Sequence, residues 1–367
     1  MILVLFDIAA SDSVKQILLL INPILIELIY FHVLFQTVNI DYSNNILIHF
    51  CKRSMDFETS KSRFLDLYQL ISNDVDKSQF LHWLKEDVIP ELDTKSSRNS
   101  IIDIKIEKIT ADIRKKLPLD ALMKTENIVY PTIGEDSNLT PANTVHIDAF
   151  LYDEQAEDAL VEEGLLSKSY CIDCGSKNID DVTFITHSCS KERLQFMFGE
   201  LLPSLKDKTV IDIGSRIGAV LYGAYFYSEA NKIVGIEINT EFCHLQRFIV
   251  DKYKLGDKIS ILEGDMASMA EVIATGDVVI LNNVFEWFMA PEMQVSMWKF
   301  LRSTFSPGTL LVTIPSLETS LEPLDTGICL ETWVKPMQTF RGLRSCTEDQ
   351  VEESDVCLYQ ILEPESV

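Results

Sequence analysis

The clearest hydrophobic pattern in the chain begins near residue 205, where short apolar runs alternate with amphipathic stretches. The apolar runs have the length of strands, and the stretches between them repeat apolar residues every three or four positions, as helices do. Such alternation predicts a mostly parallel sheet with helices on both faces. The expected strands are Thr209–Ile213, Lys232–Ile238, Ile259–Leu262, Asp277–Leu281 and Thr309–Ile314, and the expected helices cover 217–227, 240–254 and 292–305.

The N-terminal part of the chain has a different pattern. Residues 17–35 form an apolar run long enough to cross a bilayer, but Pro23, Glu27 and His32 interrupt it. A glutamate in the middle of a membrane span is costly, so a buried helix, or an upstream extension that ends before Met55, explains the run better. After Met55, stripes of apolar residues at helical spacing cover 64–71 and 80–88, whereas 99–116 fits a helix or a strand.

Composition and charge narrow the class of protein. The chain has 367 residues and a formal net charge of −24. A nucleic-acid-binding protein needs basic patches for phosphate contacts, so no direct binding to nucleic acid is expected. The eight cysteines are scattered rather than spaced as in a small secreted scaffold, which indicates a reducing compartment, cytoplasmic or nuclear.

One cysteine pair is close enough to bind a metal. Cys171 and Cys174, followed by a glycine, have the spacing of a zinc knuckle, and His187 and Cys189 could complete a set of four ligands. The spacing of the second pair is not a common one. Two ordinary buried cysteines in a turn are the alternative, and the more frequent one.

A glycine turn follows the first strand of the alternating region. The stretch "DIGSRIG" places Asp212 at the strand end and Gly214 and Gly218 four residues apart, with Arg216 between them. A dinucleotide fingerprint requires a glycine where Arg216 stands, so this turn does not match it. Further polar residues, Glu237, Asp265, Asn282 and Asn283, follow the next strands, at the carboxyl ends where ligands bind in such sheets.

These motifs together resemble those of class I S-adenosylmethionine (SAM) methyltransferases over residues 205–317. The resemblance implies a Rossmann-like, doubly wound α/β fold with a mostly parallel seven-stranded sheet, preceded by a mainly helical N-terminal region. It also implies SAM as cofactor, with Glu237 accepting from the ribose hydroxyls, Asp265 accepting from the adenine amino group, and Met266 against the ring. The full set of residues expected at the cofactor is Asp212, Gly214, Ser215, Gly218, Glu237, Asp265, Met266 and Asn282.

Arg216 departs from the family pattern, which has glycine at that position. Arginine adopts a positive φ at a higher cost than glycine does. Either the loop takes a different turn, or Arg216 points at the cofactor carboxylate or a substrate. A catalytically inactive methyltransferase-fold scaffold therefore stays an alternative to an active enzyme.

The end of the fourth strand, "LNNVFEWF", carries the candidate catalytic residues Asn282, Asn283 and Glu286. An asparagine carbonyl can hold a nucleophile, and Glu286 is the nearest acid that can take a proton. Phe285, Trp287 and Phe288 are expected to wall the acceptor channel. The alternative is that Asn283 only caps the following turn and that these aromatic residues are ordinary core.

The substrate is the least determined property. "DIGS", "GIE" and "LNN" resemble short motifs of the non-SET histone lysine methyltransferases, which implies a protein side chain as the methyl acceptor, with a small molecule as the alternative. By resemblance, residues 186–198 belong to a lid over SAM. The expected regions are an apolar segment at 1–54, a helical substrate or partner module at 55–130, a linker with the zinc candidate and lid at 131–195, and the methyltransferase domain at 196–367.

Overall fold

The structure is a computed structural model that describes residues 65, 68, 69, 71, 73–85, 89–172, 179–337 and 355–363. The apolar run at 17–35 and Cys174 lie outside these residues. No helix in the described part of the chain is both long and apolar enough to cross a membrane. The chain divides into two compact units, residues 1–101 with 342–345, and residues 102–341 with 346–367. The region boundaries given above stay predictions.

In the first unit, helix α5 (Asp74–Trp83) begins at Asn73, whose side chain accepts from the backbone N–H of Asp76 at 2.9 Å. Helix α6 (Ile89–Arg114) begins in this unit and ends in the second. The ambiguity at 99–116 is thus decided in favour of a helix. Within the second unit, Ile102, Ile106, Ile109 and Ile113 are buried, and their spacing of three and four residues puts them on one helix face.

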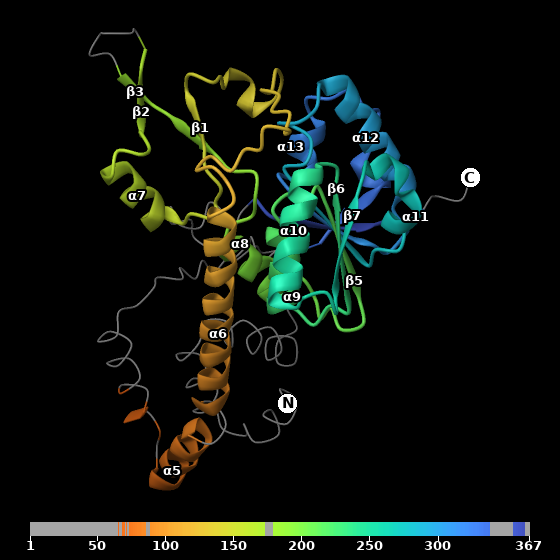
Figure 1. The fold of residues 1–367 in the computed structure, drawn as a ribbon. Coiled ribbons are helices and arrows are strands. Elements are labelled where there is room, and N and C mark those ends of the chain that lie inside the picture. The colour runs from red at the N-terminus through yellow and green to blue at the C-terminus, as the bar shows by residue number, and fades with distance from the viewer. Residues whose placement is uncertain are drawn as a thin grey trace, which may run out of the picture. The chain divides into compact units, whose positions relative to one another are not determined.

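The second unit is built on a seven-stranded sheet in the order β10-β11-β9-β8-β5-β6-β7 (Figure 1). Strand β11 is antiparallel to both of its neighbours, and the other pairs are parallel. This confirms the expected α/β fold with a mostly parallel sheet. The strands are β5 (Thr209–Ile213), β6 (Lys232–Glu237), β7 (Ile259–Glu263), β8 (Val278–Asn282), β9 (Leu310–Ile314), β10 (Val334–Pro336) and β11 (Cys357–Ile361).

Helices follow the parallel strands, and the sequence pattern predicted those near 217–227, 240–254 and 292–305 but not the two shortest ones. They are α9 (Ala219–Tyr227), α10 (Thr240–Tyr253), α11 (Ala270–Ile273), α12 (Pro291–Thr304) and, after β9, α13 (Leu317–Leu321). Local signals set their starts. Asn239 caps α10 by accepting from the backbone N–H groups of Glu241 and Phe242, and Pro291 occupies the first turn of α12.

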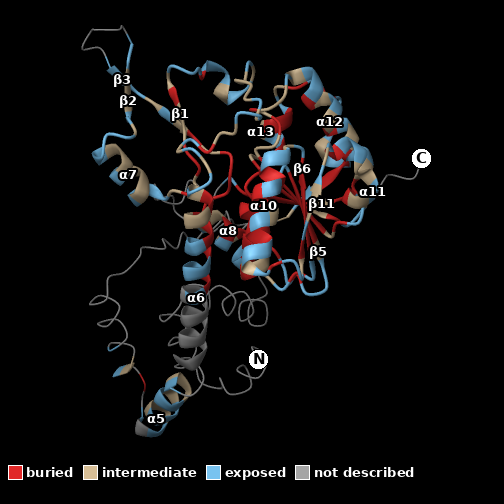
Figure 2. Cartoon of the chain, viewed as in Figure 1, coloured by how far each residue is buried: buried red, intermediate tan, exposed pale blue. Residues whose placement is uncertain are grey.

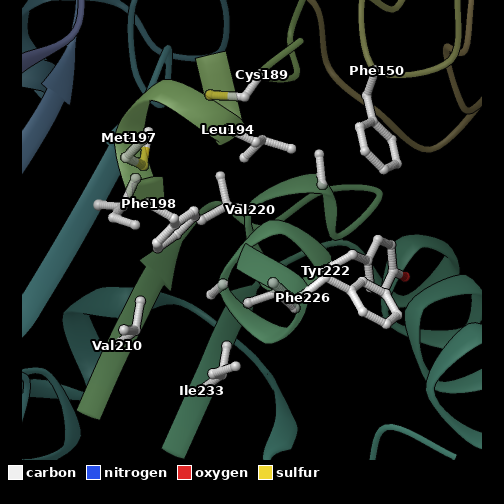
Figure 3. Packing of buried hydrophobic residues seen from close by; sticks show 14 of the residues in the cluster. Phe150, Cys189, Leu194, Met197, Phe198, Val210, Val220, Tyr222, Phe226 and Ile233 are labelled. Carbon is white, nitrogen blue, oxygen red and sulfur yellow. The ribbon is translucent and has the colours of Figure 1, made fainter. Parts of the chain in front are cut away.

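Two hydrophobic clusters cover the two faces of the sheet, and successive strand residues alternate between them. Val278 and Ile280 belong to the cluster with α6, α9 and α10, whereas Val279 and Leu281 belong to the cluster with α12 and α13. Buried residues therefore concentrate along the sheet (Figure 2). Figure 3 shows how Leu194 and Val220 meet in the first cluster.

The residues before β5 form smaller elements in the same unit. A parallel pair joins β1 (Thr144–His146) and β4 (Thr183–Ile185), and an antiparallel pair joins β2 (Ser169–Cys171) and β3 (Ile179–Asp181). They accompany helices α7 (Glu154–Glu162) and α8 (Lys191–Phe196). The β1–β4 pair brings residues 146 and 187, far apart in sequence, beside the end of β8.

Candidate functional site

Three neighbouring strands carry polar residues at or next to their carboxyl ends, and these ends lie along one edge of the sheet. Strand β5 lies between β6 and β8, and strand order reverses there, because β6 and β7 lie on one side and β8 and β9 on the other. Ligands of open α/β sheets bind at such a switch point. Asp212 is near the end of β5, Glu237 is the last residue of β6, and Asn282 is the last residue of β8.

The loop after β5 is held by its neighbours in a conformation with several positive φ angles. Gly214, Arg216 and Gly218 have φ of 76°, 44° and 88°. The backbone N–H groups of Gly214 and Ser215 donate to Ile236 O at 2.8 and 3.1 Å. Ser215 Oγ donates to Gln246 Oε1 at 3.0 Å, and Gln246 Nε2 donates to Arg216 O at 2.6 Å. The loop is thus tied to β6 and α10.

Glu237 is buried and bound to backbone on both sides. Its Oε2 accepts from Arg216 N and its Oε1 from Asn239 N, both at 2.7 Å. Burial raises the pKa of Glu237, and the hydrogen bonds from Asn239 and Arg216 act in the opposite direction. Because a carboxylate oxygen accepts two hydrogen bonds, each oxygen keeps one site for a ligand hydroxyl.

Arg216 matches neither expectation, a different turn of the loop or a side chain that points at a ligand. Its φ of 44° is in the region that favours glycine, so the loop keeps its direction despite the arginine. Its side chain turns to two acids from earlier in the chain, with Nε 2.8 Å from Glu126 Oε1 and Nη1 2.9 Å from Asp148 Oδ2. Nη2 donates to Ala121 O at 2.7 Å, and the guanidinium lies 4.9 Å from the centre of the Phe242 ring.

This network attaches the segment Ala121–Glu126 to the loops that follow β5 and β6. Asn239 Nδ2 donates to Thr125 Oγ1 at 3.0 Å, and Thr125 also donates to Glu241. Ala121–Glu126 therefore lies beside this edge, whereas the lid expected at 186–198 stays a prediction.

The remaining residues expected at the cofactor lie along the same edge. Asp212 is only 2% exposed, and burial raises its pKa well above the usual value, with the charge of Glu237 adding to the effect. Asp265 follows β7, is exposed, and accepts from Ala267 N at 2.9 Å. Met266 is buried in the cluster that contains α12.

The candidate catalytic residues at and after the end of β8 have different surroundings. Asn282 is buried, and its Nδ2 donates to His187 O at 3.4 Å, whereas its Oδ1 has no hydrogen-bond partner in the described part of the chain. Asn283 has φ of 48° and donates its N–H to Ile314 O. Glu286 accepts from Ser320 Oγ at 2.8 Å. Phe285 is core, since it is 1% exposed and packs on Trp298, and it does not wall a channel.

Beside Asn282 lies a cluster of rings from four segments. His146 Nδ1 is 3.0 Å from His187 Nε2, and Tyr130 Oη is 3.4 Å from His146 Nε2. Trp287 meets both histidine rings, and Phe288 lies 5.1 Å from the ring of His187. Burial lowers the pKa of His187 to about 2, and the charge of Arg216 adds to this effect. Burial also lowers the pKa of His146.

A cavity of about 370 Å³ opens next to this cluster, at the ends of β8 and β9. Tyr130, Trp287 and Asn283 line it, together with apolar residues such as Ile133, Met289 and Pro315. Its charged lining residues are Glu135, Asp136, Glu286, Asp355 and Arg193. Four of these five are acids, so the cavity suits a group that is cationic and partly apolar.

The zinc set does not assemble in the described residues. Cys171 is exposed on β2, whereas Cys189 is fully buried among Leu194 and Met197 (Figure 3). His187 Nε2 contacts His146 instead. Among the described residues, no three His, Cys, Asp or Glu side chains gather in a way that could hold a metal. Cys174 lies outside the described residues. Cys171 is exposed whereas His187 and Cys189 are buried, so these three do not gather, and the full set of four with Cys174 stays a prediction.

The residues at this edge fit a nucleoside-type cofactor. Glu237 has two acceptor positions left for a diol, and Asn282 at the end of β8 has a buried Oδ1 with no hydrogen-bond partner among the described residues. At Gly218 a Cβ would come within 2.7 Å of Tyr222 Oη, so the close packing of the loop requires glycine there. These residues are hydrogen-bond acceptors, and none of them is cationic, so they suit a ligand without a phosphate group.

Comparison with known proteins adds similar structures. No family model matches the chain, and no curated protein does. One similar structure is an RNA methyltransferase from Salinibacter ruber with S-adenosyl-L-homocysteine, 19% identical over 49% of this chain and 96% of that chain, with a TM-score of 0.33. Another is an O-methyltransferase from Bacillus cereus, also with S-adenosylhomocysteine, 14% identical over 49% and 84%, with a TM-score of 0.35.

In the sheet of this chain, parallel strands lie on both sides of β5 and the antiparallel β11 is inserted between β10 and β9, which is a Rossmann-like α/β arrangement.

Sequence reasoning missed Glu126, Asp148, Tyr130 and His146. Arg216 at a glycine position signalled that a partner exists, but nothing local selects two acids among the 56 of the chain. The two histidines are 41 residues apart, and only the parallel pairing of β1 with β4 brings them together.

Proposed function

We propose that this protein is a SAM-dependent methyltransferase whose acceptor is a basic group on an apolar arm, such as a protein side chain. The use of SAM as cofactor is supported by a row of hydrogen-bond acceptors at the ends of strands β6, β7 and β8. They are Glu237, Asp265 and Asn282. In this proposal Glu237 binds the ribose hydroxyls, Asp265 the adenine amino group, and Met266 packs against the base.

The bound cofactor supplies a methyl group on a sulfonium, and its transfer is an in-line displacement that depends on positioning. The protein then has to hold the nucleophile at the end of β8 and exclude water. Trp287, Phe288 and Tyr130 form an apolar wall there. Glu286 lines the adjoining cavity and is available to take a proton from an amine.

The acceptor class rests on the lining of the cavity. Its acids attract a cation, and its apolar walls suit the methylenes of a long side chain. A nucleic acid is disfavoured because the acidic lining and the net charge of −24 both repel phosphate. A small basic molecule is the remaining alternative, since the volume of about 370 Å³ also admits one.

The alternative of an inactive scaffold relied on Arg216. That residue has φ of 44°, in the region that favours glycine, and turns its side chain to Glu126 and Asp148. The substitution therefore leaves the loop able to approach a cofactor.

Calorimetric titration of the full chain with SAM and with S-adenosylhomocysteine tests the proposal. We expect micromolar or tighter binding of at least one of them. Absence of binding to both would contradict the proposal. The acceptor class is tested separately, by transfer of tritium from labelled SAM to proteins and to small molecules of a cell extract. Label that appears only in nucleic acid would contradict the acceptor assignment.

A further inference from the structure

Strand β7 is an edge of the seven-stranded sheet, and no strand of the described residues pairs with its outer side. The opposite edge is β10, which has three residues and contains Lys335 and Pro336. Lysine and proline are typical of edges that do not accept a further strand. Strand β7 has five residues, Ile-Ser-Ile-Leu-Glu, and contains neither. Its edge is therefore open to pairing, whereas that of β10 is protected.

The space beside β7 has room for a further strand. A hollow of about 700 Å³ lies along it, lined by Ile261, Leu262 and Glu263 of the strand, by Arg247 of α10 and by residues 267–272. Ile261 packs partly against the cluster with α10, and Leu262 packs partly against the cluster with α12. Each face of the edge therefore carries a half-buried apolar side chain, and a strand that paired with β7 would cover both.

The backbone groups of β7 alternate in direction along the strand. Ile233 N donates to Lys258 O at 2.9 Å, and at the other end of the same ladder Gly264 N donates to the last carbonyl of β6, also at 2.9 Å. The even-numbered residues therefore direct their N–H and C=O groups to β6, and the odd-numbered residues direct theirs outward. The outward-facing residues are Ile259, Ile261 and Glu263.

These outward groups are self-complementary about Ile261. Ile259 N–H is bound to Leu255 O at 3.0 Å, so the groups left open are three carbonyls and the N–H groups of residues 261 and 263. In an antiparallel pair of β7 strands centred on Ile261, this residue exchanges two hydrogen bonds with its own copy. Glu263 then lies opposite Ile259 of the second copy and donates its N–H to that carbonyl, once on each side of the centre. Every open N–H thus finds an acceptor.

Charge also favours a second copy as the partner. Within residues 258–264 the charged side chains are Lys258 and Glu263. Glu263 falls opposite an isoleucine of the second copy, and Lys258 falls next to Glu263 of that copy, so unlike charges approach each other. We propose that two copies of the chain pair antiparallel through β7 and join their sheets. The contact is two-fold symmetric and small, so its dissociation constant is expected on the order of 10 µM. This inference does not depend on the proposed function.

Sedimentation velocity of the full chain, from about 1 to about 300 µM at about 0.15 M salt, measures the association. The mass should rise from 41.7 kDa toward twice that value. Ile261→Pro removes an N–H that faces away from β6, and Ile261→Lys places two ammonium groups against each other at the centre. Both variants should stay monomeric, and thermal melting checks that they are folded. Ile179→Lys on β3 is the matched control, since that isoleucine is also exposed, and it should dimerise as the parent does.

Hydrogen exchange of the backbone locates the contact. The N–H groups of Ile261 and Glu263 should exchange about tenfold or more slowly at the high concentration than at the low one, whereas that of Leu262, which faces β6, should be protected at both. A monomer at every concentration overturns the proposal and leaves the edge to a strand of another protein. A dimer that persists in the folded variants, with residues 261 and 263 exchanging freely, also overturns it. If neither variant folds, the exchange of the parent decides.

Discussion

The guanidinium of Arg216 and the carboxylate of Glu126 form a two-point ion pair between residues 90 positions apart. Nε lies 2.8 Å from Oε1 and Nη2 lies 3.2 Å from Oε2, with the two side chains 7% and 6% exposed. Because the backbone N–H of the same arginine donates to Glu237, one residue joins the candidate ribose-binding acid to the segment Ala121–Glu126.

Removal of this arginine should destabilise the fold. Arg216→Ala leaves two acids, Glu126 and Asp148, buried without their cation, and breaking a buried pair costs about 3–5 kcal/mol. The free energy of unfolding from urea denaturation measures this loss. Arg247→Ala is the matched control, since its pair with Glu263 is exposed and should contribute about 1 kcal/mol or less. Equal losses in the two variants would contradict the structural role of Arg216.

The cofactor site predicts a specific loss of affinity. Glu237→Ala removes the acceptors for two ribose hydroxyls and should weaken SAM binding by about 1.5–3 kcal/mol, the range for hydrogen bonds to charged groups. Calorimetry measures the change, and thermal melting checks that the variant is folded, since Arg216 N and Asn239 N also lose a partner. Glu271→Ala on α11 should bind SAM as the parent does. Parent-like affinity in Glu237→Ala would place the ribose elsewhere.

The neutral His187 predicts a dependence of stability on pH. The unfolded chain takes up a proton at this histidine below pH 6.5, whereas the folded chain does not until about pH 2. A base with a lowered pKa in the folded state therefore costs stability as the pH falls through that window.

Between pH 6.5 and 5 the parent should lose about 2 kcal/mol more than His187→Gln, from 1.36 kcal/mol per pH unit. Urea denaturation at both pH values measures the difference. A parallel loss in parent and variant would mean that His187 titrates equally in the folded and unfolded states.

Asn282 predicts an effect on turnover. Asn282→Ala should lower turnover by about ten- to a thousandfold while SAM affinity changes far less, because the lost contact holds the acceptor in the transition state. The rate of tritium transfer to the identified acceptor measures it. Asn231→Ala, before the first residue of β6 at the opposite edge of the sheet, should transfer methyl groups at the parent rate. Normal turnover in Asn282→Ala would exclude this residue from the acceptor site.

The sequence by itself determined the five parallel strands β5 to β9 and the edge at which their polar residues lie. Strand Thr209–Ile213 and helix Thr240–Tyr253 agree with the periodicity to within a residue, because alternation and helical spacing are local properties. The polar residues that end the strands followed from the same boundaries. Strands β10 and β11 were not predicted as segments, since they follow β9 and lie outside the alternation of strands and helices that marked the other five.

The tertiary structure decided which residues meet. Glu126 and Asp148 reach Arg216 from segments 90 and 68 positions away, and His146 pairs with His187 only because β1 lies parallel to β4. The same folding left Cys171 exposed and Cys189 buried, and it left Asn282 Oδ1 and His187 Nδ1 without hydrogen-bond partners among the described residues. Burial and hydrogen-bond satisfaction depend on distances through space, and spacing along the chain does not contain them.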